Sequence, residues 1–252
     1  MRPFEKEYII KKIEEYNNII KENKIGNYEI KKVNGLNGII QGYMYSKEDT
    51  IENDILELNG ENHQWMRLTP FEIEGTYFSI KRAKGKVGIA GLGLGYTAQE
   101  IAKKAIVKEV VVYELNKEII DLYYKSFAEN EKIKIIHGDA FEAESEEFDF
   151  FFSDLYMYKL TSDVVNDYDK FNKLHKIEEY SFFGMEHFLL SCSYDKIVWV
   201  FIPENWMEMA RKAYNNLEES GYLKYYEQLP ENIVDDVLDK FKDILNAWYD
   251  NK

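Results

Sequence analysis

Apolar residues near the N-terminus recur at intervals of three and four positions, with lysines and glutamates between them. Residues three or four apart lie on the same face of a helix. The pattern therefore predicts an amphipathic helix from Phe4 to Lys24. The apolar positions are Tyr8, Ile9, Ile13, Tyr16, Ile19 and Ile20.

The period changes after residue 27, where short apolar runs alternate with turn signals. Asn-Gly dipeptides at 34–35, 37–38 and 59–60 favour tight turns, because both residue types tolerate positive φ. We therefore predict a helix and a small β-rich unit over residues 1–84. Its predicted strands are Tyr28–Ile30, Gly38–Tyr45, Ile55–Leu58 and Thr76–Ile80.

From Lys86 onward, apolar runs alternate with helical patterns. Strands that are apolar along their whole length are typical of a parallel sheet covered by helices on both faces. The pattern therefore predicts an α/β fold with a Rossmann-like, doubly wound sheet over residues 85–252. The predicted strands are Val87–Ala90, Glu109–Tyr113, Ile133–Ile136, Phe148–Phe152 and Ile197–Ile202. The predicted helices are Tyr96–Lys104, one through Ile119, Ile120 and Tyr123, and then Trp206–Ser220 and Glu231–Trp248.

Three glycines, Gly91, Gly93 and Gly95, follow the first of these strands and precede a helix. Glycine lets the backbone turn tightly and lets a ligand approach, and a helix N-terminus offers unpaired N–H groups. Read from Gly93, the loop fits the G-x-G-x-x-G/A pattern of dinucleotide sites. Read from Gly91, it is a G-x-G-x-G loop of the S-adenosylmethionine type. The loop alone leaves both cofactors open.

Polar residues follow the next three strands. Glu114 ends the second strand, where a carboxylate can bind both ribose hydroxyls. Asp139 follows the third strand, where it can accept a hydrogen bond from an adenine amino group. Asp154 and Tyr156 follow the fourth, where the reactive end of a cofactor is expected. Ligands bind at the carboxyl ends of such strands, so we expect one site there.

This succession of motifs resembles the class I S-adenosylmethionine-dependent methyltransferases over about Lys86 to Ile202. The resemblance implies that the three glycines border the methionine and ribose of the cofactor. It also implies that Glu114 binds the ribose with Leu115 beside it, and that Asp139 and Ala140 bind the adenine. Asp154, with Tyr156 nearby, would lie close to the sulfonium and act as a base or orient the acceptor.

A second, partial resemblance is to the spermidine synthase (aminopropyltransferase) family, which uses decarboxylated S-adenosylmethionine. It covers the small β-rich unit and the segment Leu58–Gln64. It implies that Gln64 contacts the cofactor and that Asp154 deprotonates an amine. Gln64 is not followed by the acidic box of that family, and Asp154-Leu155-Tyr156 lacks its second aspartate and its proline.

Ser153-Asp154-Leu155-Tyr156 also resembles the Asn/Asp/Ser-Pro-Pro-Tyr/Phe tetrad of nucleic-acid amino-methyltransferases, without both prolines. The 46 acidic residues exceed the 32 Lys and Arg, giving a formal net charge of −14. Such a surface repels a phosphate backbone. We therefore expect methyl transfer to a small-molecule acceptor such as an amine, and nucleic acid is disfavoured.

Other chemistries have little support in the sequence. The four histidines show no metal-ligand spacing, so no metal site is expected. The single cysteine, Cys192, lies in an apolar stretch typical of a buried thiol. Without a signal peptide or a long apolar run, a cytoplasmic protein that does not enter membranes is expected.

The sequence thus predicts an S-adenosylmethionine-dependent methyltransferase. An aminopropyltransferase, an NAD(P)-dependent oxidoreductase and a non-catalytic partner subunit are the alternatives. Whether the chain forms a homo-oligomer is left open.

Overall fold

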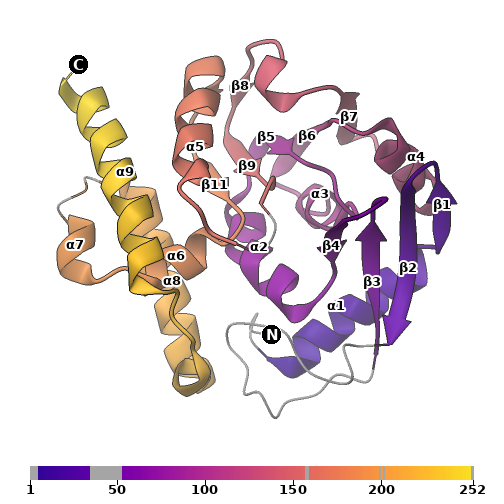
Figure 1. Cartoon of the computed structure of the whole chain (residues 1–252), viewed down its shortest axis with the longest axis horizontal. Coiled ribbons are helices and arrows are strands. Elements are labelled where there is room, and N and C mark those ends of the chain that lie inside the picture. The colour runs from indigo at the N-terminus through magenta and orange to yellow at the C-terminus, as the bar shows by residue number, and fades with distance from the viewer. Residues whose placement is uncertain (1–4, 35–52, 157–158, 199, 201, 251–252) are drawn as a thin grey trace.

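A five-stranded parallel sheet forms the centre of the computed structural model, which describes residues 5–34, 53–156, 159–198, 200 and 202–250 (Figure 1). The strand order is β11-β9-β5-β6-β7, and every neighbouring pair is parallel. The strands are β5 (Gly85–Ala90), β6 (Val107–Glu114), β7 (Ile133–His137), β9 (Phe150–Ser153) and β11 (Tyr180–Phe182). The two-residue strands β8 (Glu147–Phe148) and β10 (Lys176–Ile177) pair separately.

Both faces of this sheet are covered. Phe150, Phe151 and Phe152 are consecutive in β9, so their side chains alternate between faces, and each is at most 1% exposed. The connections β5-β6 and β6-β7 run through the helices α3 (Tyr96–Ala102) and α4 (Lys117–Ser126). The predicted α/β, Rossmann-like doubly wound fold is confirmed.

The strand order reverses direction at β5. From β5 the chain proceeds to β6 and β7 on one side, and it then returns to β9 on the other side. The loops after β5 and β9 therefore diverge, which opens a crevice at the carboxyl ends of these two strands.

The N-terminal residues form a helix and an antiparallel sheet of order β1-β2-β3-β4. The strands Tyr28–Ile30 and Ile55–Leu58 are confirmed within longer elements, whereas the predicted strand Gly38–Tyr45 lies outside the described residues. The division of the chain at residue 84 stays a prediction. The elements are α1 (Lys6–Ile19), β1 (Asn23–Ile25), β2 (Tyr28–Asn34), β3 (Asp54–Asn59) and β4 (Gln64–Arg67).

The predicted strand Thr76–Ile80 is wrong, because this segment lies within the helix α2 (Pro70–Arg82). Pro70 occupies the first turn, where its missing N–H costs nothing. At the other end of α2, the Lys104 ammonium donates hydrogen bonds to the carbonyls of Ile80, Lys81 and Ala83 at 2.5–2.6 Å. These bonds satisfy carbonyls that a helix C-terminus leaves unpaired.

The predicted strand Ile197–Ile202 is also wrong. Its first residues lie in the helix α7 (Tyr194–Val198), and β11 is the fifth strand instead. A short apolar run fits a buried helix as well as a strand. In β11 the run is interrupted by Ser181, whose hydroxyl is buried and lies 2.8 Å from that of Ser79 on α2.

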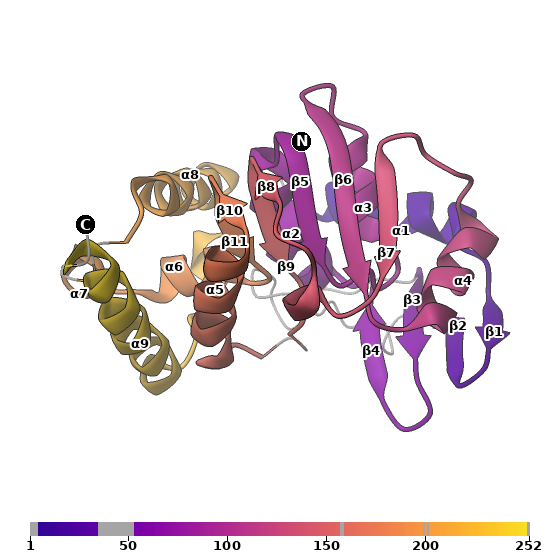
Figure 2. The same ribbon diagram turned by 90° about the horizontal axis from the view of Figure 1, so that it is seen from above.

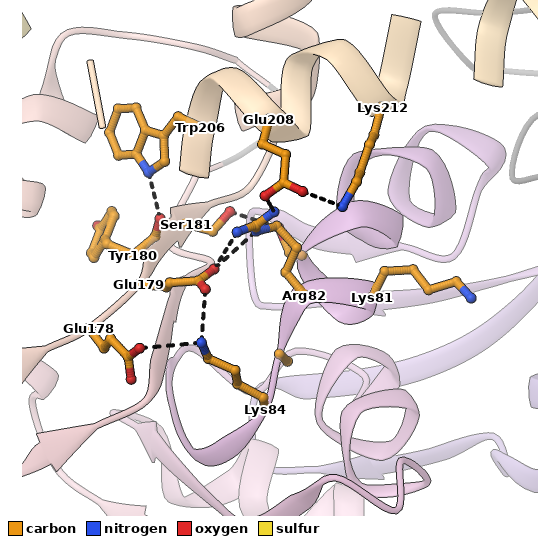
Figure 3. Close-up of polar contacts among 12 residues, drawn as sticks. Lys81, Arg82, Lys84, Glu178, Glu179, Tyr180, Ser181, Trp206, Glu208 and Lys212 are labelled. Atoms are coloured by element: carbon orange, nitrogen blue, oxygen red, sulfur yellow. Dashed lines mark hydrogen bonds and ion pairs between the residues drawn. The ribbon is translucent and has the colours of Figure 1, made fainter. Parts of the chain in front are cut away.

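Helices cover the β11 edge of the sheet, at the end of the molecule opposite the N-terminal sheet (Figures 1 and 2). Figure 3 shows how one of them, α8, is fastened there. Arg82 of α2 pairs with Glu179 at 2.9 Å and with Glu208 of α8 at 3.5 Å, and the Trp206 indole donates to the Tyr180 carbonyl at 3.0 Å. The helices are α5 (Asp163–Leu174), α6 (Met185–Ser191), α8 (Glu204–Ser220) and α9 (Glu231–Asp250).

The predicted helices at 206–220 and 231–248 are therefore confirmed. In the described part of the chain, no helix is both long enough and apolar enough to span a bilayer.

Candidate functional site

A cavity of about 300 Å³ opens at the carboxyl ends of β5, β6, β7 and β9. Its wall combines the loops after these strands with Leu58, Trp65 and Met66 of the N-terminal sheet. The cavity therefore lies at the position where the strand order reverses, as expected for a ligand site in this fold.

The glycine loop adopts backbone angles that favour glycine. The φ angles of Gly91, Gly93 and Gly95 are +98°, +52° and +79°. Gly91 and Gly93 line the cavity, whereas Gly95 caps the N-terminus of α3. The Gly91 N–H donates to the Tyr113 carbonyl at 2.9 Å, which ties the start of the loop to β6.

Protein atoms fill the space that each missing side chain leaves. A Cβ on Gly91 would lie 2.5 Å from the carbonyl oxygen of Asp154, and a Cβ on Gly93 would lie 2.6 Å from the sulfur of Met66. At Gly95 the Tyr123 ring would be 2.6 Å away. The glycines are thus required by packing around the site, in addition to any contact with a ligand.

Glu114 is held in a fixed position at the end of β6. Its Oε2 accepts a hydrogen bond from the Leu92 N–H at 3.0 Å, and its Oε1 accepts one from the Asn116 N–H at 2.8 Å. The residue is 6% exposed and lines the cavity. The Asn116 side-chain amide also donates to Oε1 at 3.4 Å, whereas Oε2 keeps a second acceptor site that a ribose hydroxyl could use.

The predicted adenine-binding residues lie together after β7. Asp139 Oδ1 accepts a hydrogen bond from the Phe141 N–H at 2.9 Å and starts the 3₁₀ turn Ala140–Glu142. Asp139, Ala140 and Phe141 line the cavity, as does Leu115, which is 63% exposed. Apolar walls beside a carboxylate suit a ring that carries an amino group.

Asp154 follows β9 and lines the cavity. Its N–H donates to the Ala90 carbonyl at 2.9 Å, so the backbone of the residue is fixed against β5. Among the described residues, no hydrogen bond or ion pair holds its carboxylate. Burial raises the pKa of Asp154 from 3.8 to about 7, because the charged form loses its hydration.

Tyr156 lies beside Asp154 in the cavity wall. Its hydroxyl donates to the Asp167 carboxylate at 3.1 Å and lies 3.2 Å from the Ser153 hydroxyl. Burial raises the pKa of Tyr156 well above 10. The phenol therefore stays neutral, and its bonds fix the orientation of the ring.

Gln64 is the one predicted binding residue on β4, and the structure does not place it in the cavity wall. Its neighbours Trp65 and Met66 line the cavity instead, and the Met66 sulfur accepts a hydrogen bond from the Leu94 N–H at 3.2 Å. Glu72 of α2, which is 3% exposed, also lines it. These three residues precede the glycine loop and belong to no motif, so their spacing gave no signal.

The charged residues that line the described cavity are all acidic: Glu72, Glu114, Asp139 and Asp154. A dinucleotide would bring its negatively charged pyrophosphate close to these carboxylates, and the carboxylates would repel it. S-adenosylmethionine carries a sulfonium and an ammonium group, which the carboxylates attract. No group of three potential metal ligands occurs among the described residues.

This fold and this site resemble those of the class I S-adenosylmethionine-dependent methyltransferases. The acidic wall of the cavity and the glycine loop fit S-adenosylmethionine as the cofactor. Within that class, residues 82–185 match the family model of ribosomal RNA adenine dimethylase. The match spans less than half of the chain, from the end of α2 to the start of α6, and includes the glycine loop and Asp154.

Three solved structures illustrate the similarity. The 23S rRNA methyltransferase ErmE is 21% identical, and the alignment covers 42% of this chain and 44% of that one, with a TM-score of 0.33. A putative RNA methyltransferase from Pyrococcus horikoshii is 20% identical, with coverages of 45% and 59% and a TM-score of 0.36. Spermidine synthase from Thermotoga maritima is 14% identical, with coverages of 78% and 62% and a TM-score of 0.40.

The chain therefore spans less than two thirds of the length of each of these proteins. Among curated protein sequences, none matches this chain significantly.

The family-model match corrects the expected partner. The net charge predicts a small-molecule acceptor and disfavours nucleic acid, whereas the matched family is named for the dimethylation of adenine in ribosomal RNA. Net charge describes the average surface, and methyl transfer requires only that one base reach one cavity. The expectation of a small-molecule partner is therefore wrong.

Proposed function

We propose that the protein methylates the exocyclic amino group of adenine in RNA. The observation that carries this proposal is the match of residues 82–185 to the ribosomal RNA adenine dimethylase family. The matched segment contains the parallel strands β5, β6, β7 and β9, whose carboxyl ends form the cavity. It also contains Asp154 and Tyr156, the residues that we assign to the acceptor.

When bound, S-adenosylmethionine supplies a methyl carbon that is activated by the adjoining sulfonium. Asp154 accepts a hydrogen bond from the amino group of the base and so aligns the nitrogen with that carbon. The nitrogen would then take the methyl group with a new N–C bond as the C–S bond breaks, and S-adenosylhomocysteine would be the by-product. The proton that the nitrogen loses passes to the Asp154 carboxylate and from there to water.

Tyr156 supports the proposed acceptor position with its ring. A base that reacts at an enzyme must leave its stack, and an aromatic side chain can replace part of the lost stacking. The hydrogen bond between Tyr156 and Asp167 keeps the ring in one orientation. We therefore assign Tyr156 to holding the adenine and Asp154 to its amino group.

The acidic wall restricts how RNA can bind. Four carboxylates line the cavity, so only an uncharged base can enter while the phosphates stay outside. With a formal net charge of −14, the surface offers little general attraction for phosphates. We expect recognition to depend on a few local contacts, and hence a shallow dependence of RNA affinity on salt.

The test is methyl transfer from radiolabelled S-adenosylmethionine to total RNA, with total DNA and a polyamine mixture in parallel reactions. Nucleosides from the digested RNA are then separated. Label in N6-methyladenosine or N6,N6-dimethyladenosine is the expected result. Asp154→Asn should abolish it, whereas Asp121→Asn on the exposed surface of α4 should not. Label confined to DNA or to amines, with normal cofactor binding, would exclude the proposal.

A further inference from the structure

Trp65 is an exposed aromatic residue at the cavity. It lies on β4 in the N-terminal sheet, outside the segment matched by the family model, and its neighbour Gln64 does not line the cavity. The Trp65 side chain lines the cavity and is 44% exposed. In Figure 2 the hairpin of β3 and β4 lies beside the ends of the parallel strands.

The indole of Trp65 is held by its surroundings. The His63 ring packs edge-on against it with 4.8 Å between ring centroids, and the Tyr28 ring lies 6.4 Å away. A Cβ on Gly60 would come within 2.6 Å of the indole nitrogen, so only glycine leaves room there. An exposed ring that is fixed in position loses little conformational entropy when a ligand packs on it.

Hydrogen bonds made by Tyr28, whose ring lies beside Trp65, connect Trp65 to the end of the cavity that we assign to the adenosine. The Tyr28 hydroxyl donates to the side-chain oxygen of Asn116 at 2.9 Å. Asn116 in turn donates its N–H to Glu114, the residue assigned to the ribose. Leu115, between these two, is the other strongly exposed apolar residue on this part of the wall.

We propose that Trp65 packs on the adenosine part of the bound cofactor, so that the N-terminal sheet completes the cofactor site. The proposal rests on S-adenosylmethionine as cofactor and does not depend on RNA as acceptor. Trp65 acts here as a positioning residue that covers the adenosine and shields the Glu114–ribose hydrogen bonds from water.

The experiment compares calorimetric affinities for S-adenosylhomocysteine and for methylthioadenosine, which lacks the amino-acid part. We expect Trp65→Ala to weaken both by about tenfold, because an aromatic contact with the adenosine is common to both ligands. Trp65→Phe should retain most of the affinity. Tyr124→Ala is the matched control, since Tyr124 is 47% exposed on α4 and does not line the cavity.

Fluorescence provides a second measurement that does not require the alanine variant to fold. Methylthioadenosine should quench the emission of the native protein, and this quenching should be absent in Trp65→Phe. Equal quenching in both proteins would overturn the proposal. An unchanged methylthioadenosine affinity in folded Trp65→Ala would also overturn the proposal. If only the affinity for RNA fell in that variant, Trp65 would belong to the acceptor side of the cavity, and the proposal would be overturned as well. Failure of RNA methylation alone leaves these binding results unaffected.

Discussion

The two ends of the cavity hold their carboxylates differently. At the cofactor end, both oxygens of Glu114 accept backbone hydrogen bonds, from Leu92 and Asn116. At the acceptor end, no described residue makes a hydrogen bond or ion pair with the carboxylate of Asp154. Burial raises the pKa of Asp154 to about 7.

This difference separates two tasks. A carboxylate that already accepts backbone N–H bonds is fixed in position, and it suits a group that must bind the same ribose in every turnover. A carboxylate with a pKa near neutral pH can accept a proton and release it again, which suits the reacting end. The first predictions below each address one end, and the last addresses the loop that connects the two ends.

The largest effect is expected from Asp154→Asn. Asparagine has nearly the same shape but cannot take the proton from the amine, so the turnover number should fall by about 100-fold or more. The affinity for S-adenosylhomocysteine, measured by calorimetry, should change less than about twofold. An equal loss of affinity and turnover would mean that Asp154 serves the cofactor, and the comparison between the two ends would fail.

Thermal unfolding provides the control for this variant. The pKa of Asp154 is raised in the folded protein from 3.8 to about 7, so its contribution to stability is present below pH 3.8 and is lost as the pH rises through 7. At pH 8 the asparagine variant avoids this cost. It should therefore melt above the native protein at pH 8, and the gap should shrink towards pH 4.

The next largest effect is expected from Glu114→Ala, which removes the carboxylate that we propose binds the ribose hydroxyls. We expect the dissociation constant for S-adenosylmethionine to rise by about 100-fold, since bonds to a charged acceptor are strong. Glu109→Ala is the control, because Glu109 lies on the same strand with a half-exposed side chain. Tight binding by folded Glu114→Ala would exclude the ribose assignment.

Much of the cofactor end was predictable because its residues follow strand ends in a fixed order. An apolar strand of four or more residues is recognisable in the sequence, and Glu114 ends one such strand while Asp139 lies two residues after the end of the next. Parallel strands bring their carboxyl ends to the same edge of a sheet. The order of motifs therefore predicts that these two residues share one site, and both line the cavity.

The wrong and missing parts have a common physical origin. The apolar runs at Thr76–Ile80 and Ile197–Ile202 fit a buried helix as well as a strand, so tertiary packing decides. Trp65 and Met66 reach the cavity only through the docking of the N-terminal sheet, which leaves no local periodicity. The net charge gave a wrong prediction of the acceptor, because it is an average over the whole surface and the cavity is only a small part of that surface.

The third prediction concerns pH and sharpens the contrast at the acceptor end. Below pH 7 the raised pKa leaves Asp154 mostly protonated, and a protonated carboxyl cannot accept the amine proton. The turnover number should therefore rise about tenfold from pH 6 to pH 8 and then level off. Cofactor affinity should stay constant over this range. A flat profile in the native protein would show that ionised Asp154 is not required.

The smallest effect is expected from a double-mutant cycle on the glycine loop, which connects the two ends. A Cβ on Gly93 would meet the movable sulfur of Met66, whereas a Cβ on Gly91 would meet the fixed carbonyl of Asp154. Both glycines have positive φ, so either alanine destabilises the protein by about 1–2 kcal/mol through strain alone. The cost of Gly93→Ala should be smaller in a Met66→Ala background, with a coupling of about 1 kcal/mol in denaturant unfolding.

The cost of Gly91→Ala should be the same in both backgrounds, since no side chain can move to relieve its contact. Equal coupling for the two glycines would contradict the geometry of the loop. If only Gly93 is coupled to Met66, then the N-terminal sheet supports the cofactor end, and the backbone of β5 and β9 alone sets the position of Asp154.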